Sequence, residues 1–121
     1  MDDVRVVVVD DYADAAEVLA ARLQLYGYSV QVALDGREAL AIVESFRPHC
    51  ILLDIGMPGI DGDELSKQLR ERFGDDIVLI AVTGRSPHDR AVAATFARVD
   101  HYLQKPVSEA ELRRVLPPVD S

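Results

Sequence analysis

The sequence predicts an α/β fold in which helices cover both faces of a parallel sheet, and two observations support this class. Short apolar runs, rich in β-branched residues, alternate with segments whose apolar residues have helical spacing, and this alternation occurs five times. Such runs are typical of strands buried on both faces of a parallel sheet. The connections between them are short, as strand–helix units require. We therefore expect one domain over residues 1–121, with residues 117–121 as a short tail that begins at two prolines.

The apolar runs place the strands along the chain. The expected strands are Val4–Val9, Ser29–Ala33, Cys50–Leu53, Ile77–Val82 and Tyr102–Leu103. Five strands of this size favour a flavodoxin-like (βα)5 sandwich of three layers, with strand order 2-1-3-4-5. In such a sheet the ligand crevice lies outside the carboxyl ends of the strands, so the residues directly after each strand become the functional candidates.

Polar residues mark where the helices begin and end. Three helix starts have the spacing of a capping box, in which a short polar side chain and a Glu three residues later satisfy free backbone N–H groups. These pairs are Asp35 with Glu38, Asp61 with Glu64, and Ser108 with Glu111. Ser86 before Pro87 indicates the start of the fourth helix. Gly27 is placed to supply the left-handed residue that ends the first helix.

Composition excludes several classes of function. The chain has 13 Lys and Arg against 21 Asp and Glu, a net charge of −8. This charge argues against binding to nucleic acid or to an anionic membrane. The sequence has no apolar run of membrane-spanning length, and Asp2 and Asp3 stand where a signal peptide would be positively charged. Cys50 is the single cysteine and is expected to be a small buried hydrophobe. We expect a cytoplasmic protein.

Four strand ends carry polar residues that this fold would gather in one crevice. Asp10 and Asp11 follow the first strand, Asp54 the third, Thr83 the fourth and Lys105 the fifth. Two carboxylates about 4 Å apart repel by roughly 1 kcal/mol in water and about 4 kcal/mol at an effective dielectric constant of 20. A divalent cation removes this cost, and oxygen ligands suit Mg²⁺ or Mn²⁺. With a lysine opposite, such a site suits a phosphoryl group and a carboxylate nucleophile.

These residues stand in motifs that resemble the receiver domain of two-component response regulators (CheY-like), from Val4 to about Leu116. The matching motifs are Val9-Asp10-Asp11, Leu52-Leu53-Asp54-Ile55-Gly56-Met57-Pro58-Gly59-Ile60-Asp61-Gly62, Ala81-Val82-Thr83-Gly84 and Tyr102-Leu103-Gln104-Lys105-Pro106. The aspartate pair alone is a weak signal, whereas the long motif around Asp54, combined in order with Thr83 and Lys105, is very specific.

The resemblance assigns a chemical role to five positions. It implies that Asp54 accepts a phosphoryl group from the phosphohistidine of a sensor histidine kinase or a histidine phosphotransfer protein. It implies that Asp11, Asp54 and the backbone carbonyl of Gly56 bind Mg²⁺ directly, with Asp10 acting through a metal-bound water. It further implies that Lys105 contacts the aspartyl phosphate and that the Lys105–Pro106 peptide is cis. The protein would be a signalling phosphoacceptor and not an enzyme.

Two further positions resemble the family's switch. Thr83 would move to bond a phosphoryl oxygen, and Tyr102 would turn inward behind it. Phosphorylation adds roughly −1.5 to −2 charges and three acceptor oxygens, which would bias the packing around the predicted fourth helix, fifth strand and fifth helix. We expect this surface to control a downstream protein, with the chain a monomer or a phosphorylation-dependent dimer.

Two positions depart from the usual pattern. Gly56 offers no side chain where many relatives carry a polar one, and Arg85 occupies a second position that tunes phosphate lifetime in the family. We hypothesise that Gly56 and Arg85 together set that lifetime. An aspartyl-nucleophile phosphohydrolase dependent on Mg²⁺ is less favoured, because Gly56 cannot act as the second acid. A non-phosphorylated interaction module is the other alternative, against which the intact Asp54 and Lys105 count.

The charged residues of the third predicted helix have a simpler interpretation. Asp63 and Glu64 stand at its start, and Arg70, Glu71 and Arg72 near its end. We expect these side chains to form a solvated helix face.

Overall fold

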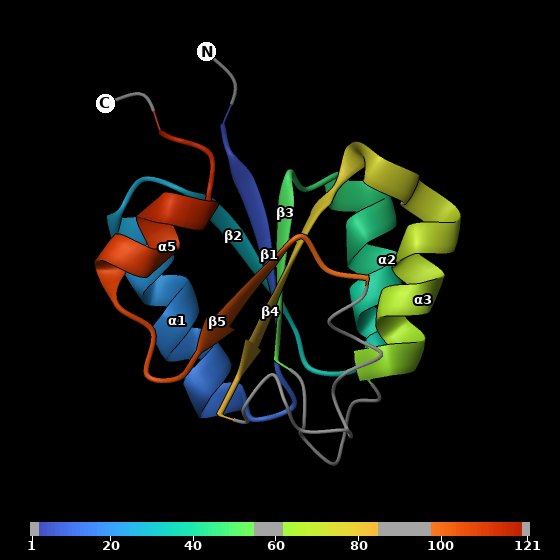
Figure 1. The fold of residues 1–121 in the computed structure, drawn as a ribbon, viewed down its shortest axis with the longest axis horizontal. Helices are drawn as coiled ribbons and strands as arrows, with labels where there is room; N and C mark the ends of the chain where they lie inside the picture. Colours follow the sequence, from blue (N-terminus) through green and yellow to red (C-terminus); the bar gives the residue numbers. More distant parts are fainter. Residues whose placement is uncertain (1–2, 55–61, 85–97, 120–121) are drawn as a thin grey trace.

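A five-stranded parallel sheet forms the centre of the molecule (Figure 1). The structure is a computed structural model that describes residues 3–54, 62–84 and 98–119. Its strands are β1 (Arg5–Val9), β2 (Ser29–Ala33), β3 (Cys50–Asp54), β4 (Val78–Thr83) and β5 (His101–Gln104). Their order, β2-β1-β3-β4-β5, confirms the predicted topology. The predicted strand ends agree with the observed ones to within one residue.

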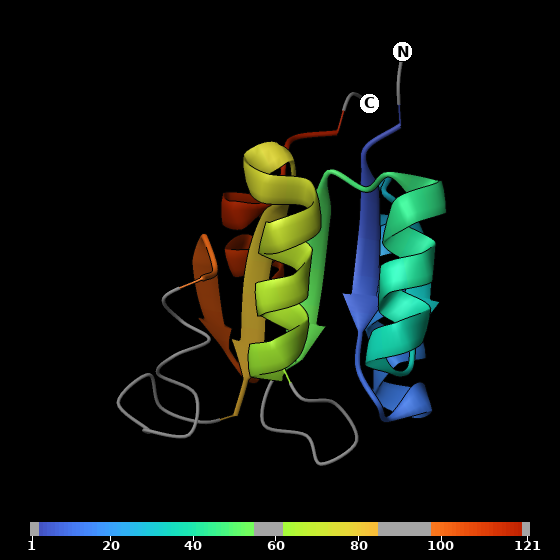
Figure 2. The same ribbon diagram turned by 90° about the vertical axis from the view of Figure 1, so that its right-hand side faces the viewer.

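Helices cover both faces of the sheet, as predicted. Helices α1 (Ala13–Leu25) and α5 (Glu109–Val115) lie against one face, and α2 (Gly36–Phe46) and α3 (Gly62–Phe73) against the other (Figures 1 and 2). A short 3₁₀ helix, η1 (Gly74–Asp76), follows α3 and was not predicted. The predicted fourth helix, with Ser86 and Pro87 at its start, lies outside the described residues, as does the Asp61 cap. No helix within the described ranges is long and apolar enough to cross a membrane.

The strands are buried on both faces, which explains their continuous apolar runs. In β1, Val7 and Val9 join the core beneath α2 and α3, whereas Val6 and Val8 join the core beneath α1 and α5. Cys50 is fully buried in the second core, as expected. Burying a side chain of this kind contributes roughly 1.5–3 kcal/mol. The two cores hold the sheet in place and leave its ends free for polar residues.

The helix ends confirm three sequence signals. The Asp35 side chain accepts a hydrogen bond from the Glu38 amide at 2.7 Å, and Ser108 Oγ accepts one from the Glu111 amide at 3.1 Å. Gly27 has φ +103°, the left-handed conformation that the end of α1 needs. A Cβ at Gly27 would also lie 2.9 Å from Val119 Cγ1, so close packing favours glycine there as well.

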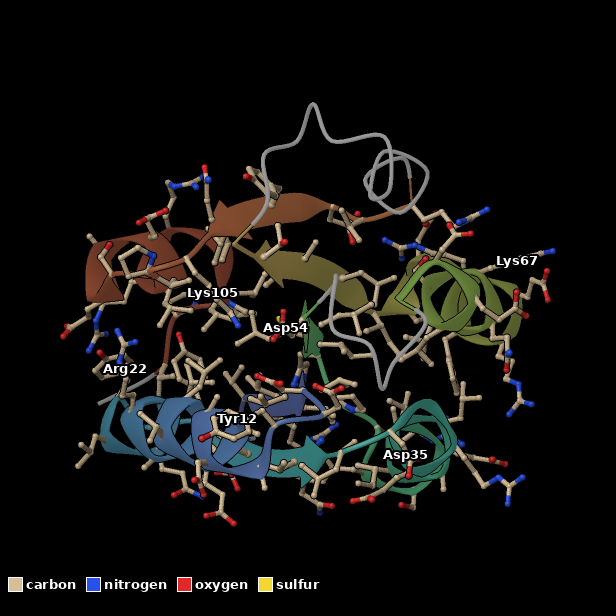
Figure 3. The ribbon with its side chains drawn as sticks, turned by 90° about the horizontal axis from the view of Figure 1, so that it is seen from below. Tyr12, Arg22, Asp35, Asp54, Lys67 and Lys105 are labelled. Atoms are coloured by element: carbon tan, nitrogen blue, oxygen red, sulfur yellow. The ribbon has the colours of Figure 1, made fainter. Side chains whose placement is uncertain are left out.

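The strand register brings the predicted functional residues to one edge. Asp54 pairs with Val82, the residue before Thr83, and Thr83 pairs with Gln104, the residue before Lys105. In Figure 1 all strands point toward the bottom of the view, so this edge is the lower one. Figure 3 looks onto it from below.

Candidate functional site

Two adjacent acids follow β1 at the edge of the sheet. The Asp10 amide donates to the carbonyl of Ala33 on β2 at 3.1 Å, and the Asp10 carboxylate accepts from the Tyr12 amide at 3.0 Å. These bonds fix the turn that leads into α1. Asp10 is 5% exposed, and the Oδ1 atom of Asp11 is shielded from solvent. The β1–α1 turn therefore holds two carboxylates at the sheet edge, one of them almost fully buried.

Asp54 and Lys105 form an ion pair at the centre of this edge (Figure 3). Asp54 is the last residue of β3 and is 5% exposed. The Lys105 Nζ atom donates to Asp54 Oδ2 at 2.8 Å, and the Lys105 backbone N–H donates to the Thr83 carbonyl, also at 2.8 Å. The Lys105–Pro106 peptide is cis, which confirms that expectation. The Lys105 ammonium, directly after β5, is thus bonded to the buried Asp54 carboxylate at the end of β3.

The pKa of Asp54 is raised by its burial and by the neighbouring acid. Burial raises the pKa of Asp54 to about 6; the hydrogen bond and charge of Lys105 oppose this shift, and the charge of Asp10 and a hydrogen bond with Asp10 add to it. The Asp10 carboxyl is thus close enough to Asp54 to raise its pKa. A bound cation, or a proton on Asp54, would relieve this repulsion.

A divalent metal fits the chemistry of these donors. Oxygen ligands from buried carboxylates suit Mg²⁺, and the repulsion between Asp10 and Asp54 is what a cation would relieve. Within residues 3–54, 62–84 and 98–119, no group of three or more His, Cys, Asp or Glu side chains is arranged to hold a metal ion. Gly56 lies outside the described residues. The set Asp10, Asp11, Asp54 and Gly56 stays a prediction.

The two predicted switch residues lie on neighbouring strands. Thr83 is fully buried at the end of β4, and Tyr102 is half-buried on β5, opposite Ala81 of β4. Thr83 thus lies on the strand next to β3, which carries Asp54, and Tyr102 on the strand beyond it; their role as a switch stays a prediction. Arg85 lies outside the described residues.

A groove beside the crevice was missed by the sequence interpretation. It encloses about 660 Å³ between α1 and the chain after β5, and its lining includes Tyr12, Val18, Pro106 and Val107. Tyr12 is 57% and Val18 63% exposed, high values for large apolar side chains. The Arg22 guanidinium donates to the Val107 carbonyl at 3.1 Å and braces one wall. The one signal that could have indicated the groove is an aromatic residue directly after the acid pair.

A parallel sheet of order 2-1-3-4-5 with helices on both faces places the chain in the class of flavodoxin-like α/β proteins, and acids, a buried threonine and a lysine lie at the carboxyl edge of its sheet. Comparison with known families makes this specific. Residues 6–117 match the family model described as the response regulator receiver domain. The chain therefore belongs to the response regulator receiver domain family.

Relatives of known name agree with this family. The chain is 44% identical over 109 residues to the response regulator MprA of Mycolicibacterium vanbaalenii, a match that covers 90% of this chain and 47% of that protein. It is 43% identical over 109 residues, with the same coverage, to MprA of Mycobacterium tuberculosis strain H37Ra. The chain thus spans about half the length of the curated relatives it matches.

Solved structures agree with the fold. The chemotaxis protein CheY4 of Vibrio cholerae superposes with a TM-score of 0.83 at 28% identity, covering 95% of this chain and all of that one. The response regulator TrrA of Thermotoga maritima, solved in complex with Mg²⁺ and BeF, superposes with a TM-score of 0.75 at 34% identity. That match covers 91% of this chain and 93% of TrrA.

Proposed function

We propose that this receiver domain accepts a phosphoryl group on Asp54 from the phosphohistidine of a sensor histidine kinase or a histidine phosphotransfer protein. The observation that carries the proposal is the buried Asp54 carboxylate, held 2.8 Å from the Lys105 ammonium. Such a transfer depends almost entirely on positioning the reacting groups and neutralising the charge on the phosphoryl oxygens.

The transfer follows from the chemistry of these groups. A carboxylate oxygen of Asp54 forms a bond to phosphorus while the P–N bond of the phosphohistidine breaks. The bonding electron pair stays on the imidazole nitrogen, which takes up a proton. Lys105 neutralises charge on the phosphoryl oxygens. A Mg²⁺ held by Asp10, Asp11, Asp54 and the Gly56 carbonyl would supply the remaining positive charge.

The groove beside α1 supports a protein as the phosphodonor. Its exposed apolar residues, Tyr12 and Val18, suit the apolar face of a partner helix more than a small polar molecule. The groove also contains Lys105 and Asp10 in its lining, so an element seated there lies beside the crevice.

The response to phosphorylation would pass through Thr83 and Tyr102 to the surface of the predicted fourth helix, β5 and α5, which would control a downstream protein. The phosphoryl group offers the Thr83 hydroxyl a strong acceptor. Movement of Thr83 would leave space for the Tyr102 ring. We retain the hypothesis that Gly56 and Arg85 set the lifetime of the phosphorylated state.

A mass measurement tests the proposal. The protein is incubated with Mg²⁺ and a small-molecule phosphodonor, and an acid-stable, base-labile phosphate adduct is expected on the peptide that contains Asp54. Chelation of the metal should slow its formation. Asp54→Asn should remove the adduct, whereas Glu17→Gln, an equivalent acid-to-amide change at an exposed position of α1, should not.

Other outcomes would favour the alternatives. No adduct from the small donor or from any candidate kinase would indicate a non-phosphorylated interaction module. Steady turnover of many phosphomonoesters would indicate a phosphohydrolase.

A further inference from the structure

Arg70, near the end of α3, joins three other segments of the chain through its side chain. Its Nε atom donates to the Arg98 carbonyl at 2.8 Å, and its Nη1 atom donates to the carbonyls of Gly74 at 2.9 Å and Ile77 at 3.0 Å. Its Nη2 atom donates to Asp100 Oδ2 at 2.6 Å. The side chain is 20% exposed. The expectation that Arg70 belongs to a solvated helix face is therefore wrong.

Asp100 links Arg70 to strand β4 of the sheet. Asp100 Oδ2 accepts from the Leu79 amide at 2.9 Å, and the Asp100 amide donates to the Leu79 carbonyl at 2.8 Å. Burial alone would raise the pKa of the Asp100 carboxyl. The hydrogen bonds from Arg70 and Leu79 outweigh this effect and hold that pKa below its usual value. An ionised Asp100 is thus fastened to β4 one residue before β5 begins, in line with the pairing of His101 with Ile80.

The position of Lys105 depends on where β5 begins. Within the described sheet, β5 is an edge strand of four residues that pairs with β4 alone. One residue of strand advances the chain by about 3.3 Å, which is more than the 2.8 Å that separates Lys105 Nζ from Asp54 Oδ2. A slip of β5 by one residue would therefore move the Lys105 backbone by more than this separation.

A second arginine ties the same segment to the other end of α3. The Arg98 guanidinium is bonded to the Asp63 carboxylate, which lies in the first turn of that helix. Both ends of α3 are thus linked to residues 98–100. The Asp63 side chain is 48% exposed, so it lies on a solvated face, as expected, while it pairs with Arg98.

We propose that Arg70 is a positioning residue for the candidate phosphoacceptor site. By fixing the start and register of β5, it places the Lys105 ammonium against Asp54 from the opposite end of the sheet. The consequence for phosphorylation rests on the function proposed above, whereas the consequence for Lys105 does not.

The variants separate positioning from general stability. Arg70→Met removes all of the side-chain donors and keeps most of the length. Arg70→Lys keeps the charge that pairs with Asp100, but a single ammonium cannot also hold three carbonyls in the geometry of a guanidinium fork. Asp100→Asn keeps an acceptor for the Leu79 amide and loses the charge. Arg72→Met is the matched control, because Arg72 is exposed two residues further along the same helix.

Native-state hydrogen exchange of the whole chain, read by NMR, is the deciding measurement. The Lys105 amide, which is bonded to the Thr83 carbonyl, is compared with the Val8 amide in the central strand β1. In Arg70→Met we expect the Lys105 amide to exchange about tenfold faster or more, beyond any change at Val8. Arg70→Lys should restore part of the protection, and Arg72→Met should leave both amides as in the parent.

Each result decides the proposal. Equal acceleration at Lys105 and Val8, or none at Lys105, would overturn it, because Arg70 would then act only on global stability. If Arg70→Met does not fold, Arg70→Lys and Asp100→Asn supply the same comparison. The rate of phosphate adduct formation should fall with loss of Lys105 protection, and an unchanged rate would overturn the link to the site. Absence of any adduct in the parent protein would instead refute the proposed function, and the exchange data would still decide the role of Arg70.

Discussion

At the amino ends of the strands the partly buried charges are arginines bonded to backbone carbonyls, whereas at the carboxyl ends they are acids that lie beside one another. Arg5, at the start of β1, donates to the carbonyls of Phe46 at 2.9 Å and Arg47 at 2.7 Å. Arg70 does the same before β4 and β5. At the other end, among the residues that the structure describes, Lys105 supplies the ammonium beside Asp10 and Asp54 and donates to Asp54 at 2.8 Å.

This difference separates the end of the sheet that stabilises the fold from the end where we propose that a cation and a phosphoryl group bind. A guanidinium can satisfy several carbonyls with its five donors, so each arginine at the amino ends fastens neighbouring segments. Adjacent buried acids destabilise the fold until a proton, a cation or a phosphoryl group with its cation relieves them. Four substitutions test this contrast.

The largest effect is expected at Lys105. Under the proposed function, Lys105→Met should slow formation of the phosphate adduct on the order of 100-fold, the usual loss when one preorganised cation or donor is removed from developing charge. The rate is measured by mass spectrometry over time. Lys67→Met, at an exposed position of α3, should react at the parental rate. A parental rate in Lys105→Met would assign no catalytic role to this ammonium.

Removal of the Asp54 charge should stabilise the metal-free protein. Since burial raises the pKa of Asp54 from 3.8 to about 6, the ionised form destabilises the folded state. Asp54→Asn should therefore raise the free energy of unfolding by up to about 3 kcal/mol. The gain should be absent below about pH 4, where Asp54 is protonated in both states, grow between pH 4 and 6, and be complete above pH 6. Urea denaturation in a chelating buffer at several pH values measures it, and a loss of stability at pH 7 would contradict the contrast.

Removal of an amino-end arginine should have the opposite sign. Arg5→Met leaves the Phe46 and Arg47 carbonyls without their charged donor and should lower the free energy of unfolding by about 2 kcal/mol. Arg37→Met, at an exposed position of α2, should change it by less than about 0.5 kcal/mol. Equal effects in the two variants, measured by urea denaturation, would show that the Arg5 bonds contribute nothing specific.

Loss of the Asp35 cap of α2, which follows the carboxyl end of β2, should give the smallest change in the free energy of unfolding. Asp35→Ala removes the bond to the Glu38 amide and should lower the free energy of unfolding by about 1 kcal/mol. Asp35→Asn keeps an acceptor and should retain most of the stability. If the two variants unfold at the same urea concentration, the cap bond is not the source of the effect.

The sheet and its crevice could be predicted because their signals are local and periodic. The apolar runs of β1 and β3 and the caps at Asp35 and Ser108 depend on residues a few positions apart, and the strand order follows from topology. The acids and Lys105 could be assigned to one edge because the carboxyl ends of parallel strands meet there.

What could not be predicted depends on contacts between distant segments. The charges of α3 are spaced like those of an ordinary exposed face. Only the path of residues 98–100 shows that Arg70 is bonded to Asp100 and that Asp63 is bonded to Arg98. The pKa of Asp54 depends on its burial and on the distances to Asp10 and Lys105. The groove beside Tyr12 exists only once α1 is packed beside the chain after β5.

Both described ends of the chain lie at the amino end of β2, away from the crevice: the Val4 carbonyl accepts from the Ser29 amide at 3.0 Å, and Val119 packs against Gly27 (Figure 1). Either terminus can therefore carry an affinity tag that anchors the protein to a sensor chip, and the crevice would then face the flowing solution. Candidate kinases and phosphotransfer proteins could be passed over such a surface and ranked by their dissociation rates.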